Sequence, residues 1–189
     1  ALREKTGADI NELSKAIGMD HRIGPKFLKA SVGFGGSCFQ KDILNLVYLC
    51  RHYGLDEVAE YWHQVIKIND FQKTRFTQKI IDTFGGNLKG KTITILGWAF
   101  KPNTNDSRES PAIYVGFQLL KAGATLKIYD PMVKKNKIIE DLQNLIFKET
   151  DLKLKSSELI NRVNIYLDVN TVINGTDAIS VITEWDKFR

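Results

Sequence analysis

Cysteine is scarce in this chain of 189 residues, which contains only Cys38 and Cys50. Two cysteines are too few for the disulfide framework of a small secreted protein, so we expect both to be reduced in a cytoplasmic protein. Long apolar runs are also absent, and without a stretch of about eighteen such residues no membrane span is predicted. The first five residues lack the apolar segment of a signal peptide and are typical of the end of a helix.

Glycine is present, but not in the arrangement that dinucleotide-binding folds use. The fingerprint Gly-x-Gly-x-x-Gly, which lets the backbone approach a pyrophosphate, occurs nowhere in the sequence. The segment 96–101 follows a predicted strand, but it has a single glycine. We therefore do not expect a pyrophosphate site of this kind there, and no metal site is predicted.

The charge is in excess on the positive side, with a formal net charge of +5. Lys and Arg are spread along the chain, and the one cluster is Lys134-Lys135-Asn136-Lys137. A small molecule that carries phosphate suits this balance as well as a nucleic acid does, and no nucleic-acid-binding motif is present. The charge alone therefore leaves the anionic partner open.

One stretch combines closely spaced glycines with a cysteine: Lys29-Ala-Ser-Val-Gly-Phe-Gly-Gly-Ser-Cys-Phe-Gln-Lys-Asp42. Its glycines, at positions 33, 35 and 36, allow positive φ angles and the close approach of a ligand. Ser37 and Gln40 have the spacing of a capping box, which predicts a helix that begins at Cys38. Unpaired N–H groups and the positive end of the helix dipole favour a thiolate there, so the pattern predicts a nucleophile.

The helix predicted after Cys38 has two different faces. Asp42 lies one turn beyond Cys38 on the same face. A separate apolar stripe consists of Ile43, Leu46, Val47 and Cys50. This pattern favours one reactive face and one core face, although the loop alone is equally compatible with Cys38 as an ordinary small residue packed at a tight turn.

The first part of the chain is predicted to consist of helices joined by loops, with a loop at residues 18–25. Asp9, with a glutamate three positions on, opens a short helix over 10–17. The Cys38 helix is expected to end near Gly54. A helix over 56–84 has no internal Gly or Pro and would extend about 40 Å, with aromatic residues on more than one face.

Strands and helices alternate after a glycine-rich linker at 85–90, which predicts two domains, 1–84 and 85–189. The predicted strands are 91–97, 125–129, 163–167 and 178–183. The predicted helices are 138–145 and one from the N-cap pair Ser110-Pro111 to Ala122, with a loop at 148–157. The fold class is α/β: a helical region with a long central helix, then a partial Rossmann-like domain with a parallel sheet, whose ligands bind beyond the carboxyl ends of the strands.

The run Gly33-Phe-Gly-Gly-Ser-Cys-Phe-Gln-Lys-Asp42 resembles the catalytic-cysteine segment of the UDP-glucose/GDP-mannose dehydrogenase family. Other segments of that family occur in the same order: Phe27-Leu-Lys-Ala-Ser31, Gly97-Trp-Ala-Phe-Lys101, Asp106-Ser-Arg-Glu-Ser110, Tyr129-Asp-Pro131 and Thr183-Glu-Trp185. The resemblance spans nearly the whole chain and is weakest between residues 132 and 175. The pair Phe39-Gln40 is most similar to members that act on UDP-glucose.

The resemblance implies an NAD-dependent, four-electron oxidation of UDP-glucose to UDP-glucuronate. Cys38 is implied as the nucleophile that holds the aldehyde as a thiohemiacetal and then as a thioester. Asp42 is implied as the carboxylate that holds the hydrolytic water. The protein is implied to be a homo-oligomer, either a dimer through the helix 56–84 or a hexamer.

The remaining site residues also come from the resemblance. The implied substrate-binding residues are Arg22, offered to the substrate of the neighbouring subunit, and Lys29, Ala30, Ser31, Val32, Gly33, Phe34, Gly35, Phe100 and Lys101. The implied cofactor-binding residues are Cys38, Phe39, Gln40, Lys41 and Arg108. Without the resemblance, Arg22 and Lys29 would be solvated surface residues, and Arg108 would pair with Asp106 or Glu109.

The resemblance further implies that this chain lacks parts of the enzyme. The N-terminal NAD-binding domain, a catalytic glutamate, the lysine that removes the alcohol proton and one substrate arginine have no counterpart here. We therefore expect the chain alone to be inactive, with NAD held mainly by the absent domain and a UDP-sugar held by the second half.

Three other functions are weighed against this one. A GDP-mannose or UDP-N-acetylmannosamine dehydrogenase of the same family tends to carry Leu-Pro where this chain has Phe39-Gln40. A non-catalytic nucleotide-sugar-binding or assembly module would keep the fold, but Cys38, Lys29 and Asp42 are all present, which argues against a decayed site. A nucleic-acid-binding protein has only the basic charge in its favour.

Overall fold

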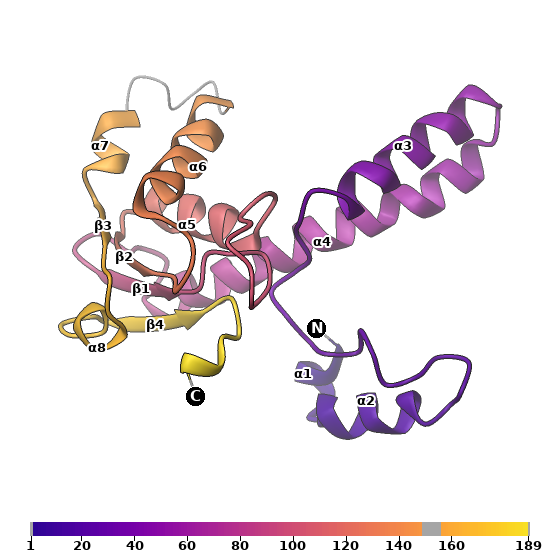
Figure 1. Cartoon of the computed structure of the whole chain (residues 1–189), viewed down its shortest axis with the longest axis horizontal. Coiled ribbons are helices and arrows are strands. Elements are labelled where there is room, and N and C mark those ends of the chain that lie inside the picture. Colours follow the sequence, from indigo (N-terminus) through magenta and orange to yellow (C-terminus); the bar gives the residue numbers. More distant parts are fainter. Residues whose placement is uncertain (1, 149–155, 189) are drawn as a thin grey trace. The chain divides into compact units, whose positions relative to one another are not determined.

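Figure 1 shows the computed structural model, which describes residues 2–148 and 156–188. The chain forms two compact units, Ala1–Ser31 and Val32–Arg189. None of the helices in the described ranges combines the length and the apolar character that a membrane crossing requires. Helices together with a parallel sheet make this an α/β protein, as the sequence predicts.

The first unit contains two short helices and a loop. The helices are α1, Leu2–Thr6, and α2, Ile10–Gly18. The Asp9 carboxylate accepts a hydrogen bond from the Asn11 N–H at 2.7 Å, which confirms the predicted N-cap. The Ser14 hydroxyl donates to the Leu28 carbonyl oxygen at 2.9 Å and thereby fastens the loop to α2.

The second unit opens with a helical hairpin. Its helices are α3, Phe39–His52, and α4, Asp56–Thr83. Gly54, at φ 71°, provides the left-handed turn between them, and α4 runs unbroken over about 40 Å as predicted. Figure 1 shows α3 beside the first part of α4, whereas the later part of α4 reaches α5. The buried apolar residues between α3 and α4 are Ile43, Val47, Cys50, Ala59 and Ile66.

A four-stranded parallel sheet lies at the centre of the rest of the chain. Its strands are β1, Thr92–Leu96; β2, Thr125–Tyr129; β3, Val163–Ile165; and β4, Ala178–Val181. Their spatial order is β3-β2-β1-β4. The chain proceeds from β1 to β2 and β3 on one side and then crosses to β4 on the other side of β1. The carboxyl ends of β1 and β4 therefore form the switch point at which such sheets bind ligands.

Helices cover both faces of this sheet. They are α5, Pro111–Lys121; α6, Lys135–Lys148; α7, Ser156–Ile160; and α8, Val169–Val172, followed by a 3₁₀ turn at Asp186–Phe188. Side chains alternate along a strand, so Ile93 and Ile95 point into the core with α5 and α6. Leu96 points to the opposite face and lies in a smaller cluster with Val172 of α8.

The structure confirms the predicted start of α5 and shifts several other boundaries. Ser110 accepts the Ala112 N–H, and Pro111 is the first helical residue. Helix α6 is longer than the predicted 138–145, and β3 and β4 end two residues earlier than predicted. Beyond the end of β4, the Thr183 hydroxyl donates a hydrogen bond to the Ala99 carbonyl oxygen at 2.6 Å. Of the predicted loop 148–157, the ends belong to α6 and α7, and residues 149–155 lie outside the described residues.

Candidate functional site

The glycine-rich loop enters α3 one residue later than the sequence predicts. The helix begins at Phe39, and Cys38 is its N-cap residue without a side-chain cap hydrogen bond. The Ser37 hydroxyl lies 3.5 Å from the Cys38 sulfur, and the Gln40 amide donates to the Glu109 carboxylate at 3.2 Å. The predicted capping box is therefore wrong, because a distant residue, Glu109, takes up the Gln40 side chain.

The two cysteines have opposite surroundings. Cys38 is exposed, whereas Cys50 is buried between α3 and α4. Asp42 lies one helical turn beyond Cys38, and its N–H donates to the Cys38 carbonyl oxygen at 2.8 Å. The Asp42 carboxylate is 68% exposed and lies 3.6 Å from the Lys41 ammonium. An exposed thiol and an exposed carboxylate thus stand one turn apart, as the spacing predicts.

Gly35 and Gly36 let this loop approach the segment that follows β1. A Cβ on Gly35 would lie 2.5 Å from the Glu109 carbonyl oxygen, and one on Gly36, at φ 92°, would lie 3.0 Å from the Phe100 ring. The Gly36 N–H donates to the Arg108 carbonyl oxygen at 2.8 Å. These contacts join the cysteine loop to residues 100–109, so the predicted residues Gly35, Phe100 and Arg108 lie together.

A buried asparagine of α4 holds the same loop. Asn69 is 3% exposed, and its amide accepts the Phe34 N–H at 2.8 Å and donates to the Phe34 carbonyl oxygen at 3.1 Å. A Cβ on Gly33 would lie 2.7 Å from the Asn69 amide oxygen, so only glycine allows this approach. Sequence reasoning missed this role. The available signal in the sequence was Asn69 itself, because a polar amide at an apolar position of a helix needs a buried hydrogen-bond partner.

Phe100 and Lys101 lie directly beyond the carboxyl end of β1, at the switch point of the sheet, as predicted. Phe100 is half-buried against Gly36, and the exposed Lys101 has its ammonium 5.3 Å from the centre of the Phe100 ring. This end of β1 therefore offers an aromatic ring and a cation side by side.

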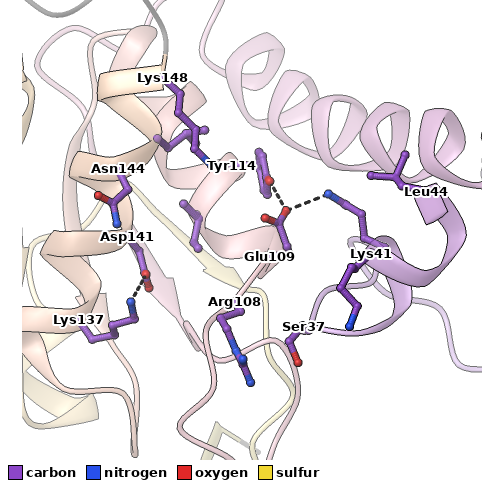
Figure 2. A pocket seen from close by; sticks show the side chains of 14 residues that line it. Ser37, Lys41, Leu44, Arg108, Glu109, Tyr114, Lys137, Asp141, Asn144 and Lys148 are labelled. Carbon is purple, nitrogen blue, oxygen red and sulfur yellow. Dashed lines mark hydrogen bonds and ion pairs between the residues drawn. The ribbon is translucent and has the colours of Figure 1, made fainter. Parts of the chain in front are cut away.

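A cavity of about 620 Å³ lies beside the start of α3 (Figure 2). Helix α3 contributes Gln40 and Lys41 to it, and the segment before α5 contributes Arg108 and Glu109. Residues of α5 and α6 line the other side. Its cationic residues are Lys41, Arg108, Lys137 and Lys148, and its acidic residues are Glu109 and Asp141. This excess of positive charge suits an anionic ligand such as a phosphate.

The cavity gathers some of the predicted cofactor-binding residues but not others. Gln40, Lys41 and Arg108 line it, whereas Cys38 and Phe39 lie outside the set of lining residues. Over residues 2–148 and 156–188, no group of three or more His, Cys, Asp or Glu side chains is arranged to hold a metal ion.

Arg108 pairs with Asp106 rather than with Glu109, which decides between the two partners left open by the sequence. Its guanidinium donates to both Asp106 carboxylate oxygens, at 3.0 and 2.8 Å. This hydrogen bonding, together with the attraction between the two opposite charges, raises the pKa of Arg108 and lowers the pKa of Asp106. The Arg108 side chain remains 64% exposed, so it can also face an anion in the cavity.

The carboxylate of Asp130 accepts hydrogen bonds from the backbone N–H groups of the loop that follows β1. Its carboxylate is 8% exposed and accepts the backbone N–H groups of Trp98 at 2.6 Å and Ala99 at 3.0 Å. Its other donors are the N–H groups of Met132 and Val133 and the indole N–H of Trp185. In dinucleotide folds the N–H groups after the first strand face a pyrophosphate. Here an internal carboxylate takes that place, which agrees with the missing glycine fingerprint.

Four predicted substrate-binding residues, Arg22, Lys29, Ala30 and Ser31, belong to the unit Ala1–Ser31. The Arg22 guanidinium donates to both Asp20 carboxylate oxygens, at 3.0 and 2.7 Å, and this pairing raises the pKa of Arg22. Lys29, Ala30 and Ser31 are exposed in this unit. Their contacts with a ligand stay predictions.

The sequence matches two models of one family. The central domain of the UDP-glucose/GDP-mannose dehydrogenase family matches residues 1–71, and its UDP binding domain matches residues 94–189. Among curated proteins, the UDP-glucose 6-dehydrogenases of Drosophila melanogaster and Pongo abelii are each 51% identical, over 188 and 189 residues. These alignments cover 100% of this chain but 38% and 37% of the relatives, so the chain spans less than two fifths of their length.

Solved structures give the same result. A UDP-glucose dehydrogenase from the hyperthermophilic archaeon Pyrobaculum islandicum superimposes with a TM-score of 0.76 at 29% identity, over 97% of this chain and 38% of that one. A GDP-mannose dehydrogenase from Pseudomonas aeruginosa shares the fold, with a TM-score of 0.62 at 24% identity over 98% of this chain and 39% of that one. Because models of this one family match residues 1–71 and 94–189, the chain belongs to the UDP-glucose/GDP-mannose dehydrogenase family.

Proposed function

We propose that this chain supplies the cysteine-bearing and UDP-sugar-binding parts of a cytoplasmic enzyme that oxidises UDP-glucose to UDP-glucuronate with NAD. The observation that carries the proposal is the exposed Cys38 at the start of α3, which the glycine loop joins to Phe100, while Ser37 and Gln40 on either side of it line a cationic cavity. The two curated relatives, each 51% identical in sequence to this chain, are named UDP-glucose 6-dehydrogenase. In this proposal residues 1–84 form the central domain and residues 85–189 the UDP-sugar-binding domain.

The residues around the cavity fit a cofactor that carries phosphate. Lys41 and Arg108 bring positive charge to its lining, and Gln40 adds an amide group. Two molecules of NAD, bound in turn and mainly by a separate domain, would each accept one hydride. In this proposal Lys41 and Arg108 hold the negative charge of the cofactor, and Cys38 to Lys41 border its reactive end.

Cys38 holds the substrate between the two oxidations. Its sulfur adds to the aldehyde carbon, the aldehyde oxygen takes up a proton, and a thiohemiacetal forms. Loss of the hydride and the hydroxyl proton from this adduct leaves a thioester. Attack of water on the thioester carbon releases the carboxylate and restores the thiol, with Asp42 positioned one turn away to accept the proton of the water.

The substrate contacts follow the same arrangement. The glycine loop offers its backbone N–H groups to the nucleotide sugar, and the ring and cation beyond β1 face the same ligand. The residues assigned to the substrate are Lys29, Ala30, Ser31, Val32, Gly33, Phe34, Gly35, Phe100 and Lys101, with Arg22 directed to the neighbouring subunit.

Chemical labelling and turnover test the proposal. Iodoacetamide at neutral pH is expected to modify Cys38 and to spare Cys50, because only Cys38 is exposed, and peptide mass spectrometry measures both.

The whole enzyme is expected to form two NADH per UDP-glucose and to prefer UDP-glucose to GDP-mannose and UDP-N-acetylmannosamine. This chain alone is expected to form no NADH. A Cys38 that does not react would favour a non-catalytic binding module. Robust NADH formation by this chain alone would contradict the proposal that a separate domain is needed to bind NAD.

We also propose that α4 carries the contacts of a homo-oligomer. Ile68 and Phe71 of α4 are 54% and 51% exposed, and further exposed apolar residues earlier in the same helix are Val58, Tyr61 and Trp62. Apolar surface of this kind on a helix marks a protein–protein contact.

Charge introduced on that surface tests the contact. Ile68→Asp with Phe71→Asp is expected to convert the oligomer to a monomer in sedimentation velocity, because a carboxylate would be buried without a partner. Phe147→Asp, at a residue of α6 that is 55% exposed, is the matched control and is expected to leave the oligomer intact. A native chain that sediments as a monomer contradicts the proposal, and the native mass distinguishes dimer from hexamer.

A further inference from the structure

Glu109 lies at the centre of a hydrogen-bonded network that reaches the cysteine turn (Figure 2). Its carboxylate accepts a hydrogen bond from the Gln40 amide at 3.2 Å and another from the Tyr114 hydroxyl. Gln40 lies in the first turn of α3, directly after Cys38 and Phe39, and Tyr114 lies in α5. One carboxylate therefore joins the start of the cysteine helix to a helix that covers the sheet.

The network continues from α5 to α4. Lys73 is 2% exposed, and its ammonium lies 3.9 Å from the centre of the Tyr114 ring and 2.7 Å from the Asp70 carboxylate. Burial, together with the hydrogen bond to Glu109, raises the pKa of Tyr114, so the hydroxyl keeps its proton and remains a donor. The ring of Tyr114 thus contacts Lys73 of α4, and its hydroxyl donates to Glu109.

The backbone of the same segment holds the other side of the cysteine loop. Glu109 has a φ of 52°, in the left-handed region that residues other than glycine rarely adopt. Its carbonyl group faces Gly35, and the carbonyl oxygen of the preceding Arg108 accepts the Gly36 N–H. Residues 108–109 therefore contact the chain before Cys38, at Gly35 and Gly36, and after it, at Gln40. An unusual backbone conformation kept in place by its surroundings is common at functional sites.

We propose that Glu109 is a positioning residue, which fixes the first turn of α3, and with it Cys38, against the segment before α5. The inference rests on the proposed function, because the position of the sulfur matters only if it is the nucleophile. Gln40 stands two positions after Cys38, and the Gly36 N–H, which donates to the Arg108 carbonyl oxygen, stands two positions before it. Releasing Gln40 frees one of these two attachments, so the sulfur is no longer held in the orientation that attack requires.

Two substitutions at one position separate the hydrogen bond from the charge. Glu109→Ala and Glu109→Gln remove the same negative charge, but only glutamine keeps an oxygen that accepts the Gln40 amide hydrogen. We expect Cys38 in Glu109→Ala to react with iodoacetamide at pH 7 at a rate lower by about threefold or more than in Glu109→Gln, the effect of one ordinary hydrogen bond. Labelling of the buried Cys50 reports in the same spectra whether each variant is folded. A rate in Glu109→Ala equal to or above that in Glu109→Gln overturns the proposal.

A substitution at the other end of the bond repeats the test without changing any charge. Gln40→Met is expected to slow the labelling of Cys38 by about threefold or more. Gln64→Met is the matched control, because Gln64 donates to Glu60 on the exposed surface of α4, and the rate there is expected to stay at the native value. A native rate in Gln40→Met overturns the proposal even if the Glu109 variants fail to fold.

The outcome for the unmodified chain distinguishes this inference from the proposed function. If native Cys38 reacts no faster than the thiol of free glutathione, the proposed nucleophile is wrong. If native Cys38 reacts faster and the variants do not differ as expected, only the positioning role of Glu109 is wrong.

Discussion

Replacing Cys38 with alanine in the whole enzyme is expected to lower the rate of UDP-glucuronate formation at least about a thousandfold. The reason is that Cys38 is the one exposed thiol of the described residues, and it stands at the start of α3, where the glycine loop meets Phe100. Without the sulfur, the aldehyde has no covalent attachment between the two oxidations. NADH formation followed by absorbance, with the product separated by chromatography, measures the effect.

Two further variants control this experiment. Cys50→Ala removes the other thiol from the core between α3 and α4 and is expected to keep the activity within about threefold, since it deletes one small buried group. Asp42→Asn is expected to slow hydrolysis, so the thioester accumulates as an added mass on the peptide that carries Cys38. A Cys38→Ala enzyme that retains a tenth or more of the native rate contradicts the assignment of the nucleophile.

Replacing Asp130 with alanine is expected to lower the free energy of unfolding by at least about 4 kcal/mol. The two oxygens of this carboxylate accept hydrogen bonds from four backbone N–H groups and one indole, at distances from 2.6 to 3.3 Å. Trp98 and Ala99 are almost completely buried, so their N–H groups would lose their partner without reaching water. A buried donor left in this way costs about 1–3 kcal/mol. Urea unfolding followed by circular dichroism measures the loss.

Asp168→Ala is the matched control for this substitution. Asp168 caps the short helix α8 with one hydrogen bond to the Thr171 N–H, at 2.8 Å, on an exposed surface. Loss of a cap of this kind costs about 1 kcal/mol. Asp130→Asn is expected to fall between the two alanine variants, because asparagine keeps one acceptor oxygen and loses the charge. Equal losses for Asp130→Ala and Asp168→Ala would mean that the buried N–H groups find other partners.

Local elements of the fold could be predicted because their signals lie within a few residues of each other. The caps at Asp9 and Ser110 were predicted and confirmed, as was the uninterrupted helix α4. The capping box at Ser37 was predicted and is wrong, although its spacing is as good as that at Asp9. The difference is the distant carboxylate of Glu109, which competes for the Gln40 side chain and which no local pattern can reveal.

The site shows the same division. The face shared by Cys38 and Asp42 follows from helical spacing, and the three glycines indicate a close approach without saying what is approached. The partners are Phe100, Glu109 and Asn69, each more than thirty positions away along the chain. Glu109 lay within a motif that was recognised, yet its hydrogen bonds to Gln40 and Tyr114 could not be read from that motif.

By itself, the sequence determined the α/β class, the long helix and the cysteine at the start of a helix, because caps, apolar periods and glycine spacing act over one or two turns. Only the tertiary structure decided which residues surround that cysteine. It placed β4 beside β1. It also paired the N–H groups after β1 with the Asp130 carboxylate and brought Glu109 to the first turn of α3. These choices depend on contacts between distant segments, and their energies are set by packing and by the need to pair every buried polar group.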